Sequence, residues 1–141
     1  MNTMKKIFLS ILILFVIALL CGCQGEDSKI LTVAEKKIES GLESDLQNGY
    51  LNYYKILKAE LYTPNAEDFD NPDLVEQCKT ANTHIVYELR LGDNTGETGL
   101  VQMERYSHVE KDENGNFAEI PEDTVYFDYD LHEKNAGTYE E

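Results

Sequence analysis

Apolar residues recur along this chain first with a helical period and then with a strand period. The helical part is a set of apolar residues spaced three or four apart, as on one face of an amphipathic helix: Leu31, Ala34, Ile38, Leu42 and Leu46. Thr32 and Glu35 have the spacing of a capping box, so the helix is predicted to begin at Thr32. Asn48-Gly49 is predicted to end it. Gly41 lies inside, where glycine costs about 1 kcal/mol relative to alanine, so the helix depends on packing.

The strand part follows as segments in which apolar and polar residues alternate. These segments are Tyr50–Tyr62, Thr83–Leu91, Leu100–Lys111, Phe117–Ile120 and Thr124–Asp130. Asn114-Gly115 predicts a tight hairpin turn, and Pro121 interrupts the final pair of segments. The order predicts an α+β domain over residues 32–130, in which the N-terminal amphipathic helix packs on an antiparallel meander of four or five strands.

The alternation also predicts which strand side chains face the helix. In the first strand they are Leu57, Ala59 and Leu61, and in the second they are Ile85, Tyr87, Leu89 and Leu91. His84 falls on the outer face, where we expect it to be exposed. Arg105 and Ser107 interrupt the inner face of the third strand, so a bulge or a register change is predicted near them.

Two further segments are candidates for contact with a ligand. Tyr50, Tyr53 and Tyr54 form either a stacking platform for a sugar or peptide or a plug at the edge of the core. Thr63–Asn82 is a long acidic excursion that includes a short helix after Asn71-Pro72. It is either a binding surface, together with the outer strand face, or a solvated loop.

The beginning of the chain has the pattern of a secretory signal peptide. Lys5 and Lys6 precede an apolar run, Ile7–Leu20, that is broken only by Ser10. This run is shorter than the ~20 residues that a membrane-spanning helix needs. An uncleaved apolar anchor and a freely secreted product are the alternatives to a cleaved leader.

The residues that follow, Leu20-Cys21-Gly22-Cys23, resemble the lipobox of bacterial lipoproteins. The resemblance implies cleavage between Gly22 and Cys23 and a diacylglycerol thioether on Cys23, which would become the mature N-terminus. It implies a lipid-anchored protein on the extracytoplasmic side of the cell membrane. The chain then divides into a signal peptide (residues 1–22), a tether (23–31), the α+β domain (32–130) and a flexible acidic tail (131–141).

Charge and cysteine content narrow the possible partners. The net charge is −15, and because two of the 12 basic residues lie in the leader, the mature chain would carry −17. Nucleic acid is therefore excluded as a partner, since phosphate binding needs a basic surface. Cys78 alone would remain as a free thiol, so no disulfide is expected within the mature domain.

Candidate chemistry is sparse. Asp112, Asn114 and Asn116 have the alternate spacing of a calcium loop, but Phe117 replaces the glycine that such a loop requires. His84 and His108 could pair across strands as a metal or pH-sensing pair, and Glu88 and Glu104 could form a carboxylate pair. We expect plain strand residues and a plain hairpin at these positions, with no metal and no cofactor.

These observations predict a non-enzymatic envelope lipoprotein whose domain binds another protein or a ligand; its oligomeric state stays open. One alternative is an immunity or exclusion lipoprotein that intercepts a cationic toxin or a phage. Another is a minimal hydrolase that uses His84 or His108 with Glu88 in a pocket between helix and sheet. The order of elements resembles cystatin-like and nuclear-transport-factor-like small domains, without a shared motif, so it implies no function.

Overall fold

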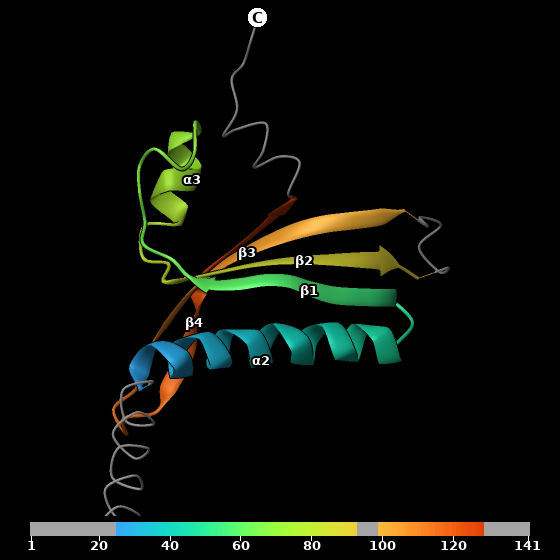
Figure 1. The fold of residues 1–141 in the computed structure, drawn as a ribbon, viewed down its shortest axis with the longest axis horizontal. Helices are drawn as coiled ribbons and strands as arrows, with labels where there is room; N and C mark the ends of the chain where they lie inside the picture. The colour runs from blue at the N-terminus through green and yellow to red at the C-terminus, as the bar shows by residue number, and fades with distance from the viewer. Residues whose placement is uncertain (1–24, 93–98, 129–141) are drawn as a thin grey trace, which may run out of the picture.

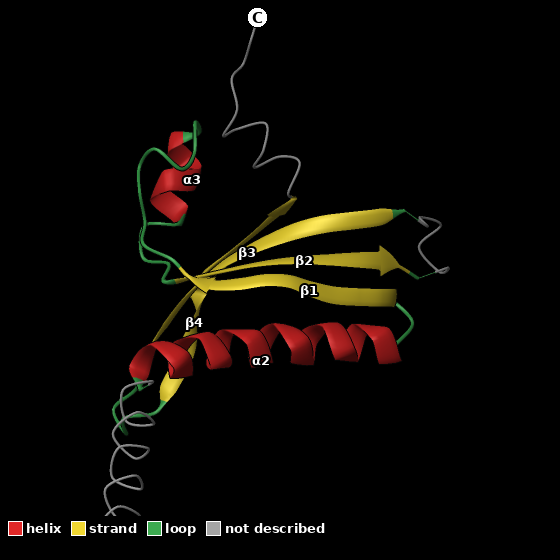
Figure 2. Ribbon diagram, viewed as in Figure 1, coloured by secondary structure: helices red, strands yellow, loops and turns green. Residues whose placement is uncertain are grey.

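The computed structural model describes residues 25–92 and 99–128. Four strands form one antiparallel sheet in the order β1-β2-β3-β4, with α2 on its inner face and the segment that contains α3 on its outer face (Figures 1 and 2). The elements are α2 (Glu26–Gln47), β1 (Leu51–Leu61), α3 (Pro72–Gln77), β2 (Thr83–Leu91), β3 (Leu100–Lys111) and β4 (Phe117–Asp128). The predicted α+β arrangement of one helix packed on an antiparallel meander is confirmed, with four strands.

The helix α2 begins at Glu26, six residues before the predicted start at Thr32. The predicted capping box is wrong, because Thr32 lies inside the helix and Gly25 is the N-cap residue without a side-chain cap. Two electrostatic interactions favour the earlier start of the helix. Glu26 and Asp27 place negative charge at the positive end of the helix dipole, and Glu26 accepts a hydrogen bond from Lys111 of β3. Most of the predicted tether is therefore helical.

The apolar stripe of α2 packs on the inner face of the sheet, as the helical period predicts. Ala34, Ile38 and Leu42 are buried there against residues of three strands: Leu51, Ile85, Tyr87 and Val109. Burial of each large aliphatic side chain stabilises the fold by about 1.5–3 kcal/mol. The helix ends where predicted, with Asn48 as its C-cap and Gly49 at a φ of 77°.

The prediction for β1 is wrong at Leu57. A register shift between Ile56 and Lys58 makes Leu57 an extra residue, which reverses the alternation. Leu57 is exposed, whereas Ile56 and Ala59 pack on the inner core. Leu61, which was also predicted to face the helix, is exposed at the end of the strand. The strand β1 is one edge of the sheet, and a bulge is one of the devices that discourage edge-to-edge association.

The last two predicted segments form one strand, β4, rather than two. The pairing of β4 with β3 shifts between Tyr106 and His108, so the predicted irregularity near Ser107 is confirmed. The residues around Pro121 lie at this shift, and Pro121 is tolerated because β4 is the other edge of the sheet. The predicted hairpin at Asn114-Gly115 is also confirmed, with Gly115 at a φ of 79°.

A second apolar cluster covers the outer face of the sheet. Phe69, Cys78 and Ala81, from the excursion between β1 and β2, are buried against Tyr106 and Phe127. The short helix α3 begins as predicted, since the Asn71 side chain accepts a hydrogen bond of 2.9 Å from the Asp73 N–H. The excursion is thus a folded cover over part of the outer face. Among the described residues, no helix combines the length and apolarity that crossing a membrane requires.

Substitutions at two glycines are expected to change the stability of the fold in opposite directions. A Cβ at Gly41 would meet no atom within 4 Å, so Gly41→Ala is expected to stabilise the fold by up to about 1 kcal/mol. A Cβ at Gly92 would lie 2.1 Å from the Gly49 carbonyl oxygen, so Gly92→Ala is expected to destabilise it by about 1–3 kcal/mol. Urea unfolding of both variants measures these changes. Equal effects of the two substitutions would contradict the described contact between Gly49 and Gly92.

Candidate functional site

A cleft of about 430 Å³ opens between α2 and the inner face of the sheet. Its floor is mostly apolar and comes from the helix and from two strands: Ile38, Leu42, Leu51, Tyr87, Leu89 and Leu91. Its rim carries Lys37, Asp45, Tyr50 and Tyr126, while Gly41 leaves the helix wall without a side chain. The volume and lining are those of a small-molecule pocket.

The position of α2 explains why the cleft is open. The helix runs alongside β1, at one edge of the sheet (Figure 1). Tyr126 comes from β4 at the other edge, yet it lines the same cleft as residues of α2. The inner face of the strands between them is therefore only partly covered by the helix.

Three tyrosines add hydroxyl groups to the cleft, besides the charged Lys37 and Asp45 at its rim. Tyr87 lies in the floor and is buried, and this burial raises its pKa to about 12, so its hydroxyl stays protonated at neutral pH. Tyr50 and Tyr126 are 60% and 55% exposed. Two partly exposed aromatic rings therefore border the cleft at its rim.

Close backbone contacts hold Tyr50 at the rim. The Gly92 N–H donates to the Tyr50 carbonyl at 2.8 Å, and the Tyr50 N–H donates to the Asp45 carbonyl at 2.9 Å. These bonds join the end of α2 to the end of β2. Because Gly92 lacks a side chain, its backbone can approach the Gly49 carbonyl closely enough to make this joint.

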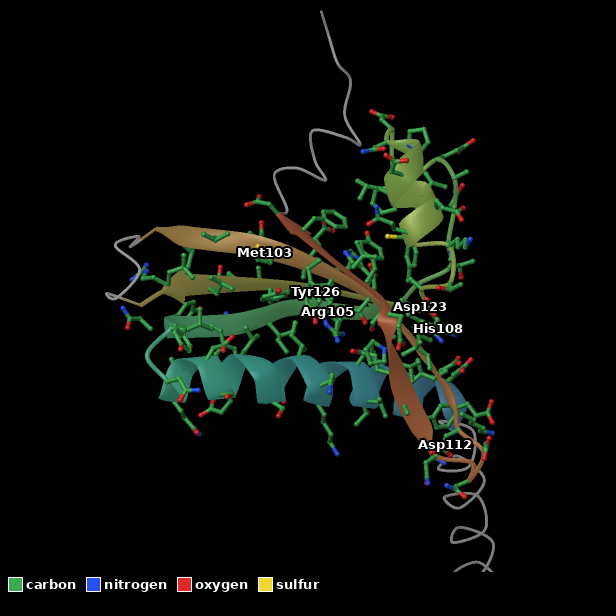
Figure 3. All side chains as sticks on the ribbon, turned by 180° about the vertical axis from the view of Figure 1, so that it is seen from behind. Met103, Arg105, His108, Asp112, Asp123 and Tyr126 are labelled. Carbon is green, nitrogen blue, oxygen red and sulfur yellow. The ribbon has the colours of Figure 1, made fainter. Side chains whose placement is uncertain are left out.

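A buried arginine holds Tyr126 in place. Arg105 donates from Nε to the Tyr126 hydroxyl at 3.1 Å, donates to Ser107 Oγ at 3.2 Å and forms an ion pair with Glu119. Burial lowers the pKa of Arg105, but the hydrogen bonds to Glu119 and Tyr126 outweigh it and leave the pKa above its ordinary value. Figure 3 shows Arg105 and Tyr126 next to each other.

His84, expected on the exposed outer face, is buried there instead. Its Nδ1 lies 3.0 Å from Glu60 and its Nε2 lies 2.7 Å from Glu104, and its ring stacks on Tyr106 with centroids 4.3 Å apart. Lys58 and His84 hold the pKa of Glu60 below its ordinary value. The expectation of exposure was wrong because the alternation cannot show that the Thr63–Asn82 segment folds over this face.

His84 and His108 contact carboxylates rather than each other, and Glu88 contacts a tyrosine. His108 Nδ1 lies 2.9 Å from Asp123 (Figure 3), whereas His84 lies between Glu60 and Glu104. Glu88 accepts a hydrogen bond of 2.7 Å from the Tyr53 hydroxyl. None of His84, His108 and Glu88 lines the cleft between helix and sheet.

The residues with the spacing of a calcium loop form a hairpin turn. Asp112 accepts hydrogen bonds from the N–H groups of Asn114 and Asn116 at 2.8 and 2.9 Å. Its carboxylate therefore stabilises the turn. Within residues 25–92 and 99–128, no group of three His, Cys, Asp or Glu side chains is arranged to hold a metal ion.

The sequence indicated only part of this site. Of the three tyrosines that the sequence offers for stacking, Tyr50 lines the cleft, whereas Tyr53 bonds to Glu88. Tyr54 packs on the core and bonds to Glu43. The sequence showed no sign that Asp45 and Tyr126 line a site, because each falls where the helix or strand pattern expects an ordinary surface residue. Gly22 and Cys23, the predicted cleavage and lipidation residues, lie outside the described residues.

Comparisons of this chain with protein-family models, with curated proteins and with solved structures give no match.

Cys78 provides a test of the cover on the outer face. Its side chain is 1% exposed, and burial, with the nearby charges of Glu104 and Asp68, raises its pKa to about 11. In a Cys21→Ser/Cys23→Ser chain, we expect alkylation of Cys78 at neutral pH to be more than about tenfold slower in the native state than in concentrated urea. The mass shift on reaction with iodoacetamide measures both rates. Equal rates would contradict the packing of the Thr63–Asn82 segment.

Proposed function

We propose that this protein is a bacterial envelope lipoprotein whose domain binds a small ligand outside the cytoplasm. The lipid anchor is supported by Lys5 and Lys6, the apolar run Ile7–Leu20 and the lipobox-like Leu20-Cys21-Gly22-Cys23. A diacylglycerol on Cys23 supplies two acyl chains, which is enough for stable anchoring. Ligand binding is supported by the cleft, which is the observation that carries this proposal.

The length of α2 relates the anchor to the cleft. The helix begins at Glu26, so only Gln24 and Gly25 separate it from Cys23. Asp45, at the rim of the cleft, lies 19 residues further along the same helix, which corresponds to about 30 Å. A lipid on Cys23 would thus hold one end of α2 at the membrane, with the cleft rim about 30 Å along the helix.

The negative charge supports this orientation. A mature chain of net charge −17 is repelled by anionic lipid head groups within a Debye length of ~8 Å. The anchor keeps the domain at the membrane, while this repulsion discourages the rest of the domain from lying on it. The cleft then stays accessible to ligands in solution.

The anchor is tested by metabolic labelling with an alkyne fatty acid. We expect the parent chain to incorporate the label, Cys23→Ser to lose it and the matched control Cys78→Ser to keep it. In-gel fluorescence after conjugation measures incorporation. Labelling of Cys23→Ser at the level of the parent would rule out this lipoprotein assignment.

The cleft is tested by filling it. Gly41 borders the cleft with open space beside it, so Gly41→Phe is expected to occupy the cleft without disturbing the core. Ser40→Phe adds the same ring to an exposed position of α2 that does not line the cleft. With the leaderless chain and the neutral apolar dye Nile red, we expect Gly41→Phe to reduce binding by more than about tenfold and Ser40→Phe to leave it unchanged. Dye fluorescence measures binding, and equal binding by both variants would contradict the proposed site.

A further inference from the structure

We propose that the ligand is an amphipathic organic cation, with an apolar body on the floor of the cleft and one positive head beside Asp45 and Tyr50. This inference rests on the proposed function, because it gives a chemical class to the ligand of the same cleft. Three features carry it: the apolar floor, the charge at the end of α2 and the aromatic ring at the rim.

No basic side chain of α2 balances the negative charge at its C-terminal end. This end carries the negative pole of the helix dipole, and its last turn contains no basic residue. Among the described residues, the Asp45 side chain forms no ion pair, whereas Glu43 accepts a hydrogen bond from the Tyr54 hydroxyl. The Asp45 carboxylate is therefore the group at the rim that is available to a cation.

Lys37 does not neutralise Asp45. It lies eight residues earlier on the same helix, so the two side chains start about 12 Å apart along the cleft that both line. With a net chain charge of −15, the surroundings also favour a cation over an anion.

The aromatic rim favours an organic cation over a metal ion. Tyr126 already has the Arg105 guanidinium over its ring at 5.4 Å, so the ring with free access is Tyr50, which is 60% exposed. An ammonium or guanidinium group gains cation–π attraction from such a ring. A metal ion would need several oxygen ligands, and the cleft presents one carboxylate. The apolar floor then requires that the head be attached to an apolar body.

The test compares three probes of similar size: benzyltrimethylammonium, benzyl alcohol and benzenesulfonate. Dissociation constants are measured by saturation-transfer difference NMR on the full-length chain in uncharged maltoside micelles, with empty micelles as the blank. At low salt we expect the cation to bind about tenfold more tightly than the anion. Asp45→Asn and Tyr50→Ala are each expected to weaken cation binding about fivefold and to change benzyl alcohol binding less.

Asp27→Asn is the matched control, since it removes the same charge from an exposed position at the other end of α2 and should leave all three constants unchanged. Anion binding as tight as cation binding, or no effect of Asp45→Asn, would overturn the cation proposal. If benzyl alcohol still binds and Gly41→Phe abolishes this binding, the proposed cleft function stands without the cation. If no probe binds, both proposals fail.

Discussion

The structure depends on the packing of one helical stripe against one face of a twisted sheet. Ala34, Ile38 and Leu42 are the buried residues of α2, and they meet apolar residues of β1, β2 and β3. This contact holds α2 beside the edge strand β1. The uncovered part of the inner face is a direct consequence, because one helix is narrower than a four-stranded sheet. The cleft is thus a product of the same contact that stabilises the fold.

Buried charges accompany both faces of the sheet. On the inner face, Arg105 pairs with Glu119, and on the outer face, His84 lies between Glu60 and Glu104. Arg105 and Glu119 form a buried ion pair. Removing one partner of such a pair typically destabilises a protein by about 3–5 kcal/mol, because the other charge stays buried without compensation. Such groups therefore favour the strand register in which their partners meet. The Arg105 group has the additional effect of orienting Tyr126 at the cleft.

The functional proposal combines two independent parts. The proposed anchor rests on the leader and the lipobox-like residues before Cys23, whereas the proposed binding site rests on the three-dimensional arrangement of α2, β1, β2 and β4. The helix α2 is the element common to both, since its first residues follow the proposed lipidation site and its last three turns border the cleft. The length of α2 would then set the distance between the membrane and the ligand.

Short-range chemistry determined what the sequence predicted correctly. The stripe of α2, the stop at Asn48-Gly49, the hairpin at Asn114-Gly115 and the cap at Asn71 each depend on residues within a few positions of one another. The tertiary structure decided the features that depend on distant partners. Examples are the start of α2, where Glu26 meets Lys111, and the burial of His84 beneath a segment whose fold depends on Phe69 and Tyr106. The bulge at Leu57 and the cleft itself belong to the same class, because local periodicity carries no information about which distant surfaces meet.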